Sequence, residues 1–242
     1  MKRLDFIKLN LLATAGLNIL SINQNRKKAS NQLLTGRQKP VLTQNDILDI
    51  LVYPDFQKMQ KAALKDGIKI QIISGYRSFN RQLSIWNKKY HKYKNLEMSE
   101  KDIFKKISTY SALPGTSRHH WGTEIDIIDA NSAPPENGFL NPRNYDKDGV
   151  YNALYQWMLA NSEDYGFYLV YTNDEHRQGF NFEPWHYSYK PLAKNYLKHY
   201  SRLELNIDVK DDRVGGSDHI DKEVLLSYFH THVLGINPLL LP

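Results

Sequence analysis

Two short strings in the chain concentrate the residue types that bind metal ions. SRHHWGTEID runs from Ser117 to Asp126, and EPWH runs from Glu183 to His186. The chain has no cysteine, which excludes thiolate ligands and a cysteine nucleophile and leaves imidazole and carboxylate as the ligands that suit zinc. Two histidines and one carboxylate leave a fourth coordination position for water. The two strings therefore predict a hydrolytic metal site.

The first string leads into a predicted strand, TEIDII, at residues 123–128. Alternation along this strand places Asp126 on the same face as Glu124, whereas Ile125 and Ile127 point the other way. One face of the sheet is therefore apolar, and the other can hold the site. We expect His119 on the loop before the strand, where it can reach the metal that Asp126 binds.

The second string sets a geometric condition on the site. Glu183 and His186 are three residues apart, an offset that sends two side chains to opposite faces of a regular strand. If both serve one metal ion, the chain must bend at Pro184.

The remaining periodicities predict an α+β domain, a small antiparallel sheet flanked by helices. Besides 123–128, strands are expected at 68–74, 167–171 and 185–189. Helices are expected at 43–66, where Thr43 would form an N-terminal cap, and at 80–94, 99–110, 150–160 and 191–200. Residues 131–148, which are rich in Pro, Gly, Asn and Asp, are expected to form a loop.

Three strings together resemble the motifs of the VanY/VanX-type D-alanyl-D-alanine carboxypeptidases. These strings are SGYRS at 74–78, PGTSRHHWGTEID at 114–126 and EPWH at 183–186. The family pattern, S-x-H-x-x-G-x-x-x-D followed by E-x-W-H, is met at every fixed position, and the similarity covers about residues 45–200. The resemblance implies a hedgehog/D-Ala-D-Ala peptidase-like fold and a zinc peptidase that acts on peptidoglycan stem peptides.

Carried over position by position, the resemblance assigns a role to each residue of these motifs. It implies that His119, Asp126 and His186 bind one zinc ion and that Glu183 is the general base. It also implies that Arg77 polarises the scissile carbonyl, that Ser117 orients the substrate or the metal loop, and that Trp185 walls the site.

Two residues within the motifs leave alternatives open. Glu124 stands where many relatives carry a small residue, so it could tune substrate choice, pair with a cation such as Arg118, or be solvated. His120 could replace His119 as a ligand, contact the substrate, or serve in packing and hydrogen bonding behind the ligands.

Several functions share this metal chemistry. The main prediction is a D-alanyl-D-alanine carboxypeptidase, and the alternatives are an L,D-carboxypeptidase, a wall endopeptidase and a non-catalytic wall-binding module. A helix-borne HExxH zinc site, a G-x-S-x-G serine elbow and a phosphate-binding G-x-x-x-x-G-K string are all absent from the sequence. The net charge of +6 comes without a nucleic-acid-binding motif, so no nucleic-acid partner is expected.

Composition divides the chain into four segments. Residues 1–22 place Lys2, Arg3 and Lys8 around the start of an apolar stretch, as in an export signal or N-terminal anchor. Residues 23–40 are predicted to be a linker, residues 41–203 the peptidase domain, and residues 204–242 a C-terminal extension of unassigned role. We expect a monomer exported to the periplasm or cell envelope, tethered to the membrane if the leader is not cleaved. The absence of cysteine is equally compatible with the cytoplasm.

Overall fold

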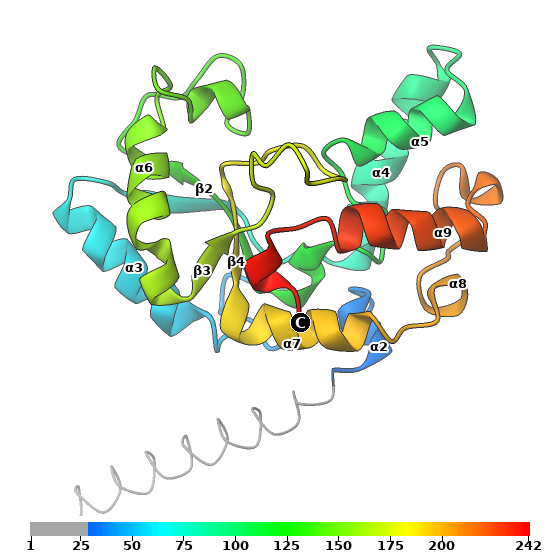
Figure 1. The fold of residues 1–242 in the computed structure, drawn as a ribbon, viewed down its shortest axis with the longest axis horizontal. Helices are drawn as coiled ribbons and strands as arrows, with labels where there is room; N and C mark the ends of the chain where they lie inside the picture. The colour runs from blue at the N-terminus through cyan, green and yellow to red at the C-terminus, as the bar shows by residue number, and fades with distance from the viewer. Residues whose placement is uncertain (1–28) are drawn as a thin grey trace, which may run out of the picture. The chain divides into compact units, whose positions relative to one another are not determined.

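A four-stranded antiparallel sheet forms the centre of residues 29–242, the part of the chain that this computed structural model describes (Figure 1). Its strand order is β1 (Ile70–Ser74), β2 (Glu124–Asp129), β4 (His186–Tyr189) and β3 (Phe167–Leu169). In the register of the two central strands, Asp126 faces His186 and Glu124 faces Ser188. Strand pairing therefore brings together the two strings that are 57 residues apart.

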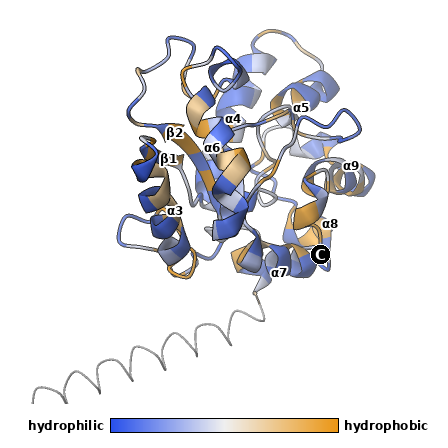
Figure 2. Ribbon diagram, turned by 60° about the vertical axis from the view of Figure 1, so that its left-hand side comes forward, coloured by the Kyte–Doolittle hydropathy of each residue, from blue (hydrophilic) through white to orange (hydrophobic). Residues whose placement is uncertain are grey.

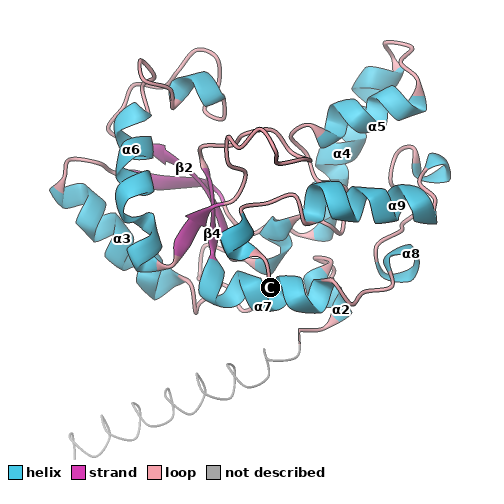
Figure 3. Ribbon diagram, viewed as in Figure 1, coloured by secondary structure: helices cyan, strands magenta, loops and turns pink. Residues whose placement is uncertain are grey.

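Helices surround this sheet, which confirms the predicted α+β class (Figure 3). Within residues 29–242 they are α2 (Asn31–Leu34), α3 (Tyr53–Lys65), α4 (Phe79–Lys94), α5 (Glu100–Ser108), α6 (Asn152–Asn161), α7 (Lys190–Tyr200), α8 (Leu205–Asp208) and α9 (Lys222–Tyr228). Two of the helices have serine caps that form hydrogen bonds. The Ser78 side chain accepts from the backbone of Arg81 at the start of α4, and Ser99 accepts from Asp102 at the start of α5.

One face of the sheet is the core of the molecule. Ile125 and Ile127 of β2 and Tyr187 of β4 are buried in a single cluster with apolar residues of α3 and α6. Figure 2 shows hydrophobic residues on β1 and β2 close to these two helices. The alternation predicted for β2 is thus present, and the residues between the core residues face the opposite side of the sheet.

The first long helix begins later than predicted. Residues 43–52 form turns instead, held by a bridge between Leu42 and Asp49, and Asp46 adopts a positive φ of 53° that is incompatible with a helix. Helix α3 begins at Tyr53, with Pro54 in its first turn. The T-x-x-D pattern at Thr43 therefore marks a turn and not a helix cap.

The domain boundaries predicted from composition are wrong at both ends. Residues 31–40 are not a linker, because α2 buries Leu33 and Leu34, and the indole of Trp121 donates a hydrogen bond to the Leu34 carbonyl at 3.0 Å. The chain from Asn31 to Pro242 forms one unit, so the domain is not confined to residues 41–203.

The C-terminal extension is an integral part of this unit. It begins with α8, continues through α9 and buries Val209, Leu225 and Tyr228. The Tyr228 hydroxyl accepts a hydrogen bond from the Leu113 backbone at 2.9 Å, so the extension supports the loop that leads to His119.

The predicted leader and the beginning of the predicted linker lie outside the described residues. No helix formed by residues 29–242 is both long enough and apolar enough to span a membrane.

Candidate metal centre

The structure brings His119, Asp126 and His186 together on the polar face of the sheet. His119 lies in a short 3-10 helix, η1 (Arg118–Trp121), which ends at Gly122 with a φ of 70° that glycine adopts without strain. Asp126 lies in β2, and His186 is the first residue of β4. One potential ligand atom from each of the three buried residues lies within 4.8 Å of the others.

The spacing and chemistry of these atoms fit a zinc ion. His119 Nε2 is 3.4 Å from Asp126 Oδ2, and His186 Nδ1 is 3.7 Å from Asp126 Oδ1. Ligand atoms about 2.0–2.1 Å from a tetrahedral zinc ion are separated by roughly 3.3 Å. Asp126 Oδ1 is also buried without a hydrogen-bond donor among the described residues, an arrangement that is costly unless a cation completes it. These three residues could therefore hold the metal.

The two histidines present different ring nitrogens to this position. His119 Nδ1 lies 2.7 Å from the carbonyl oxygen of Gly75, a pure acceptor, so Nδ1 carries the proton and Nε2 is available to a metal. His186 has the opposite arrangement, because its Nε2 lies 3.0 Å from Glu124 Oε2 and its Nδ1 points towards Asp126 and Glu183.

Glu183 reaches the same position through the bend that the sequence required. A turn at Pro184, in which His186 donates a backbone hydrogen bond to Glu183 at 3.1 Å, precedes the first residue of β4. The turn brings Glu183 Oε2 within 3.0 Å of His186 Nδ1. Burial raises the pKa of the Glu183 carboxyl, which favours its use as a proton acceptor and donor near neutral pH.

The charges around the centre keep Asp126 ionised. Burial raises the pKa of Asp126, but His119, His186 and the Arg77 guanidinium outweigh this effect and lower the pKa to about 2. The pKa of His186 behaves in the opposite way: burial lowers it, whereas the hydrogen bonds to Glu124 and Glu183 raise it to about 10.

Arg77 lies at the edge of the centre in a fixed orientation. One guanidinium nitrogen donates to Gln82 Oε1 at 2.8 Å, and the other donates to Ser74 Oγ at 2.9 Å and lies 4.0 Å from Asp126 Oδ2. Burial lowers the pKa of Arg77, while the nearby Asp126 and Glu183 raise it. A cation held in this way can stabilise negative charge that develops beside the metal.

A comparison with known families decides what kind of protein carries this centre. The family model described as VanY, D-alanyl-D-alanine carboxypeptidase, matches residues 45–192, more than half of the chain. The chain belongs to the VanY family. The predicted family is confirmed, and the matched region contains all three motifs.

Individual relatives and a solved structure are also similar to this chain. A D-alanyl-D-alanine carboxypeptidase of Enterococcus faecalis is 29% identical over 194 residues, which are 74% of this chain and 63% of that protein. An uncharacterized Haemophilus influenzae protein is 33% identical over 111 residues, 46% of this chain and 85% of that protein. The solved structure of VanYB in complex with D-alanine-D-alanine shares 28% identity with a TM-score of 0.50, covering 68% of this chain and 83% of that one. This chain thus spans less than two thirds of the length of the Enterococcus protein.

Trp185 does not occupy the place that the VanY resemblance suggested. It was expected to wall the site, but it is only 3% exposed and packs in the core, with its ring centroid 5.7 Å from that of Tyr145. Trp185 lies in the turn directly before β4, and its carbonyl accepts the Ile127 backbone N–H at 3.2 Å, so the pairing with β2 continues and its side chain takes the core side of the sheet, opposite His186.

Ser117 and His120 belong to the loop that carries the proposed ligand His119. Ser117 is buried immediately before η1, and its carbonyl accepts the His120 backbone N–H at 3.1 Å. His120 Nδ1 donates to the Arg77 carbonyl at 2.6 Å, and its Nε2 accepts from the Gly115 backbone at 3.2 Å. His120 thus serves in hydrogen bonding behind the ligands, and it lies outside the three-residue group.

Two features of this VanY-family site were missed or left open by the sequence. Glu124 is fully buried and pairs with Arg118, so the alternative of a solvated Glu124 is wrong. Lys89 of α4 is half-buried and its amine donates to the Ser111 hydroxyl, and within residues 29–242 it forms no ion pair. Burial lowers the pKa of Lys89, and the charges of Glu183 and Arg77 act on it from the metal centre.

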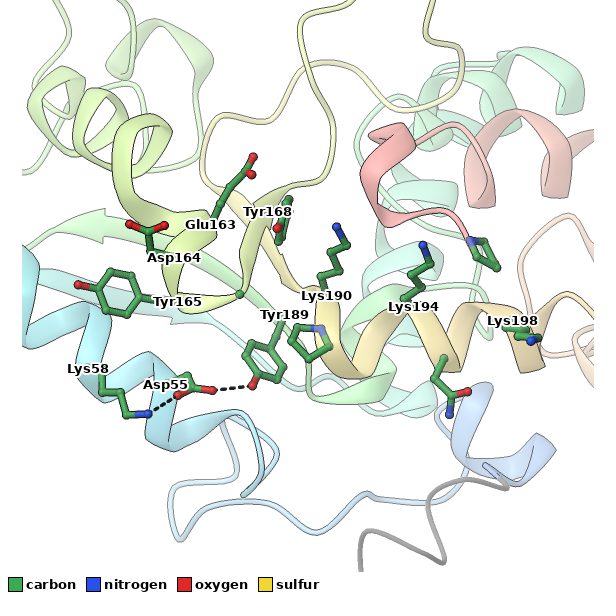
Figure 4. Close-up of a pocket in the computed structure, with 14 residues that line it drawn as sticks. Asp55, Lys58, Glu163, Asp164, Tyr165, Tyr168, Tyr189, Lys190, Lys194 and Lys198 are labelled. Carbon is green, nitrogen blue, oxygen red and sulfur yellow. Dashed lines mark hydrogen bonds and ion pairs between the residues drawn. The ribbon is translucent and has the colours of Figure 1, made fainter.

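A large pocket lies elsewhere in this VanY-type domain. It has a volume of about 840 Å³ and lies between α3, β3, β4 and α7 (Figure 4). Tyr189 donates a hydrogen bond to Asp55 at 2.6 Å in this pocket, and Lys190, Lys194 and Lys198 follow one another along α7. None of the three proposed ligands lines the pocket, so we do not assign the hydrolytic chemistry to it.

Proposed function

We propose that this protein is a zinc-dependent D-alanyl-D-alanine carboxypeptidase that hydrolyses the terminal peptide bond of peptidoglycan stem peptides. The observation that carries the proposal is the convergence of Glu183 on the His119, Asp126 and His186 group, with Arg77 beside it. Membership of the VanY family supports the peptidase chemistry, and a related structure holds D-alanine-D-alanine.

The residues divide the reaction between them. A zinc ion at this centre would act as a Lewis acid that polarises the scissile carbonyl and makes water more acidic. Glu183 takes the proton of the attacking water and delivers it to the leaving amine. Arg77, held by Gln82 and Ser74, stabilises the negative charge that develops on the carbonyl oxygen.

A carboxypeptidase must also accommodate the terminal carboxylate of its substrate. Lys89 and Arg77 are near enough for the charge of Arg77 to act on Lys89, and the Gln82 amide that holds Arg77 also donates to the Ala112 carbonyl, next to the Lys89 partner Ser111. These two cationic side chains favour a substrate with a free carboxyl end over an internal bond of a wall polymer.

The proposal is tested with the Glu183→Gln variant and purified stem peptides. The zinc-loaded wild type should release D-alanine from a pentapeptide stem, and mass spectrometry of pentapeptide and tetrapeptide products separates D,D- from L,D-activity. Glu183→Gln should retain zinc, because the three ligands remain, but lose about 10²- to 10⁴-fold in rate with the general base removed. Glu163→Gln changes an exposed glutamate of the pocket in Figure 4 and should retain full activity. Near-full activity of Glu183→Gln would contradict the assignment, and a zinc-loaded wild type that binds wall without cleaving any stem would favour a binding module.

A further inference from the structure

Glu124 is a fully buried carboxylate on the face of the sheet that carries the metal centre. It lies two residues before Asp126 on β2, and its partner in the register is Ser188, two residues after His186 on β4. Burial of a charged side chain is unfavourable unless hydrogen bonds and an opposite charge compensate it. The contacts of Glu124 supply both.

The Glu124 carboxylate is held on all sides. Oε1 accepts hydrogen bonds from Ser188 Oγ at 2.7 Å and Thr123 Oγ1 at 2.9 Å. The Arg118 guanidinium donates to both carboxylate oxygens at 3.3 Å and to Ser188 Oγ at 2.7 Å. Arg118 is itself 3% exposed and lies over the Trp121 ring, 4.8 Å from its centroid. The carboxylate therefore cannot turn away from its remaining neighbour, His186.

The contact between Glu124 and His186 determines which ring nitrogen of His186 faces the proposed metal position. Glu124 Oε2 lies 3.0 Å from His186 Nε2, and an ionised carboxylate can only accept, so the proton of His186 must be on Nε2. With the Nε2 proton held by Glu124, a metal bound by His186 would take the place of any proton on Nδ1, which lies 3.7 Å from Asp126 Oδ1 and 3.0 Å from Glu183 Oε2. His119 has only the neutral Gly75 carbonyl in the equivalent place.

We propose that Glu124, fixed by Arg118 and Ser188, is a positioning residue that holds His186 in the tautomer and orientation that bind the metal. This inference rests on the proposed function only in taking His186 as a ligand. A carboxylate behind a metal-bound imidazole orients the ring and increases its basicity, and loss of such a partner typically weakens metal binding 10- to 100-fold. The Glu124–Arg118 pair is thus part of the metal site although neither residue reaches the metal.

Two variants separate positioning from folding. Glu124→Gln keeps the shape of the side chain but removes its charge. The double variant Arg118→Met, Glu124→Leu replaces the buried ion pair by apolar side chains of similar size, a change that proteins commonly tolerate. Asp129→Asn is the matched control, because Asp129 is a buried carboxylate of the same strand whose Oδ1, among residues 29–242, accepts only from the Lys69 and Asn131 backbones.

The readouts are zinc affinity, measured by competition with a chromophoric chelator, and the protonated nitrogen of His186, measured by ¹⁵N NMR of the imidazoles. We expect both variants to bind zinc 10- to 100-fold more weakly and to lose the single Nε2–H form, with Asp129→Asn unchanged. If Glu124→Gln binds zinc within twofold of the wild-type affinity, the inference is overturned. This holds even if the double variant fails to fold. A wild type that binds zinc through His186 but cleaves no stem peptide would refute the proposed function alone.

Discussion

On one face of β2 and β4, Ile125, Ile127 and Tyr187 pack against α3 and α6, whereas on the other face Glu124, Asp126 and His186 pack against one another. Residues of both faces are almost completely buried. The difference lies in what burial does for the free energy of folding. Burying an aliphatic side chain stabilises the fold by about 1.5–3 kcal/mol, whereas burying a charge costs free energy that only its partners can offset.

The polar face keeps its charges because each has a partner. Arg118 pairs with Glu124, and His186 lies between Glu124 and Glu183. Two buried atoms of this face lack a hydrogen-bond partner among the described residues, Asp126 Oδ1 and Arg118 Nη1, and of these only Asp126 Oδ1 can bind a cation. A face built for stability alone would be apolar. This face instead fits a centre that a cation completes, while the apolar face holds its strands in register.

Of the changes to the polar face, Asp126→Asn is expected to have the largest effect on zinc binding. A neutral amide is a poor zinc ligand. Loss of a residue that only hydrogen-bonds to a ligand typically weakens zinc binding 10- to 100-fold, and loss of the ligand Asp126 should weaken it more. Chelator competition measures the loss, and circular dichroism checks that the isosteric variant is folded. Wild-type zinc affinity in Asp126→Asn would remove this residue from the proposed ligand set.

The next residue, Ile127, tests the opposite face. Ile127→Ala removes buried aliphatic volume and should lower the free energy of unfolding by about 2–5 kcal/mol, as measured by denaturant titration. The folded fraction should bind zinc with wild-type affinity, because Ile127 points away from the ligands. Ile207→Ala, at a position 78% exposed, is the control and should change stability little. A loss of zinc affinity in Ile127→Ala beyond the unfolded fraction would show that the two faces are not independent.

The sequence predicted this division of the sheet because its signals are local. Alternation in TEIDII separates Asp126 from Ile127, and the spacing of Glu183 and His186 requires the turn that the structure has at Pro184. The same alternation, counted from His186, would have placed Trp185 in the core. The motif resemblance obscured that signal.

Features that depend on distant contacts could not be predicted in this way. The sequence offered Arg118 only as one alternative partner for Glu124, because the contact with Ser188 joins residues 64 positions apart. Helix α2 was mistaken for linker because its four residues are too few to show a period, and its burial depends on Trp121. The role of Lys89 likewise arises only when α4 packs beside the centre.

The smallest expected effect is that of Lys89, which lies at the edge of the polar face and tests how the substrate is bound there. We expect Lys89→Met to lower kcat/KM for a stem peptide with a free terminal carboxylate by about 10- to 100-fold, the range for a hydrogen bond to a charged group. The same peptide with a C-terminal amide lacks that charge, and its slower hydrolysis should be equal in wild type and variant. Lys88→Met, at the exposed neighbouring position, is the matched control. An equal loss on acid and amide would mean that Lys89 supports the fold of the site and does not bind the carboxylate, because only a direct contact distinguishes the two substrates.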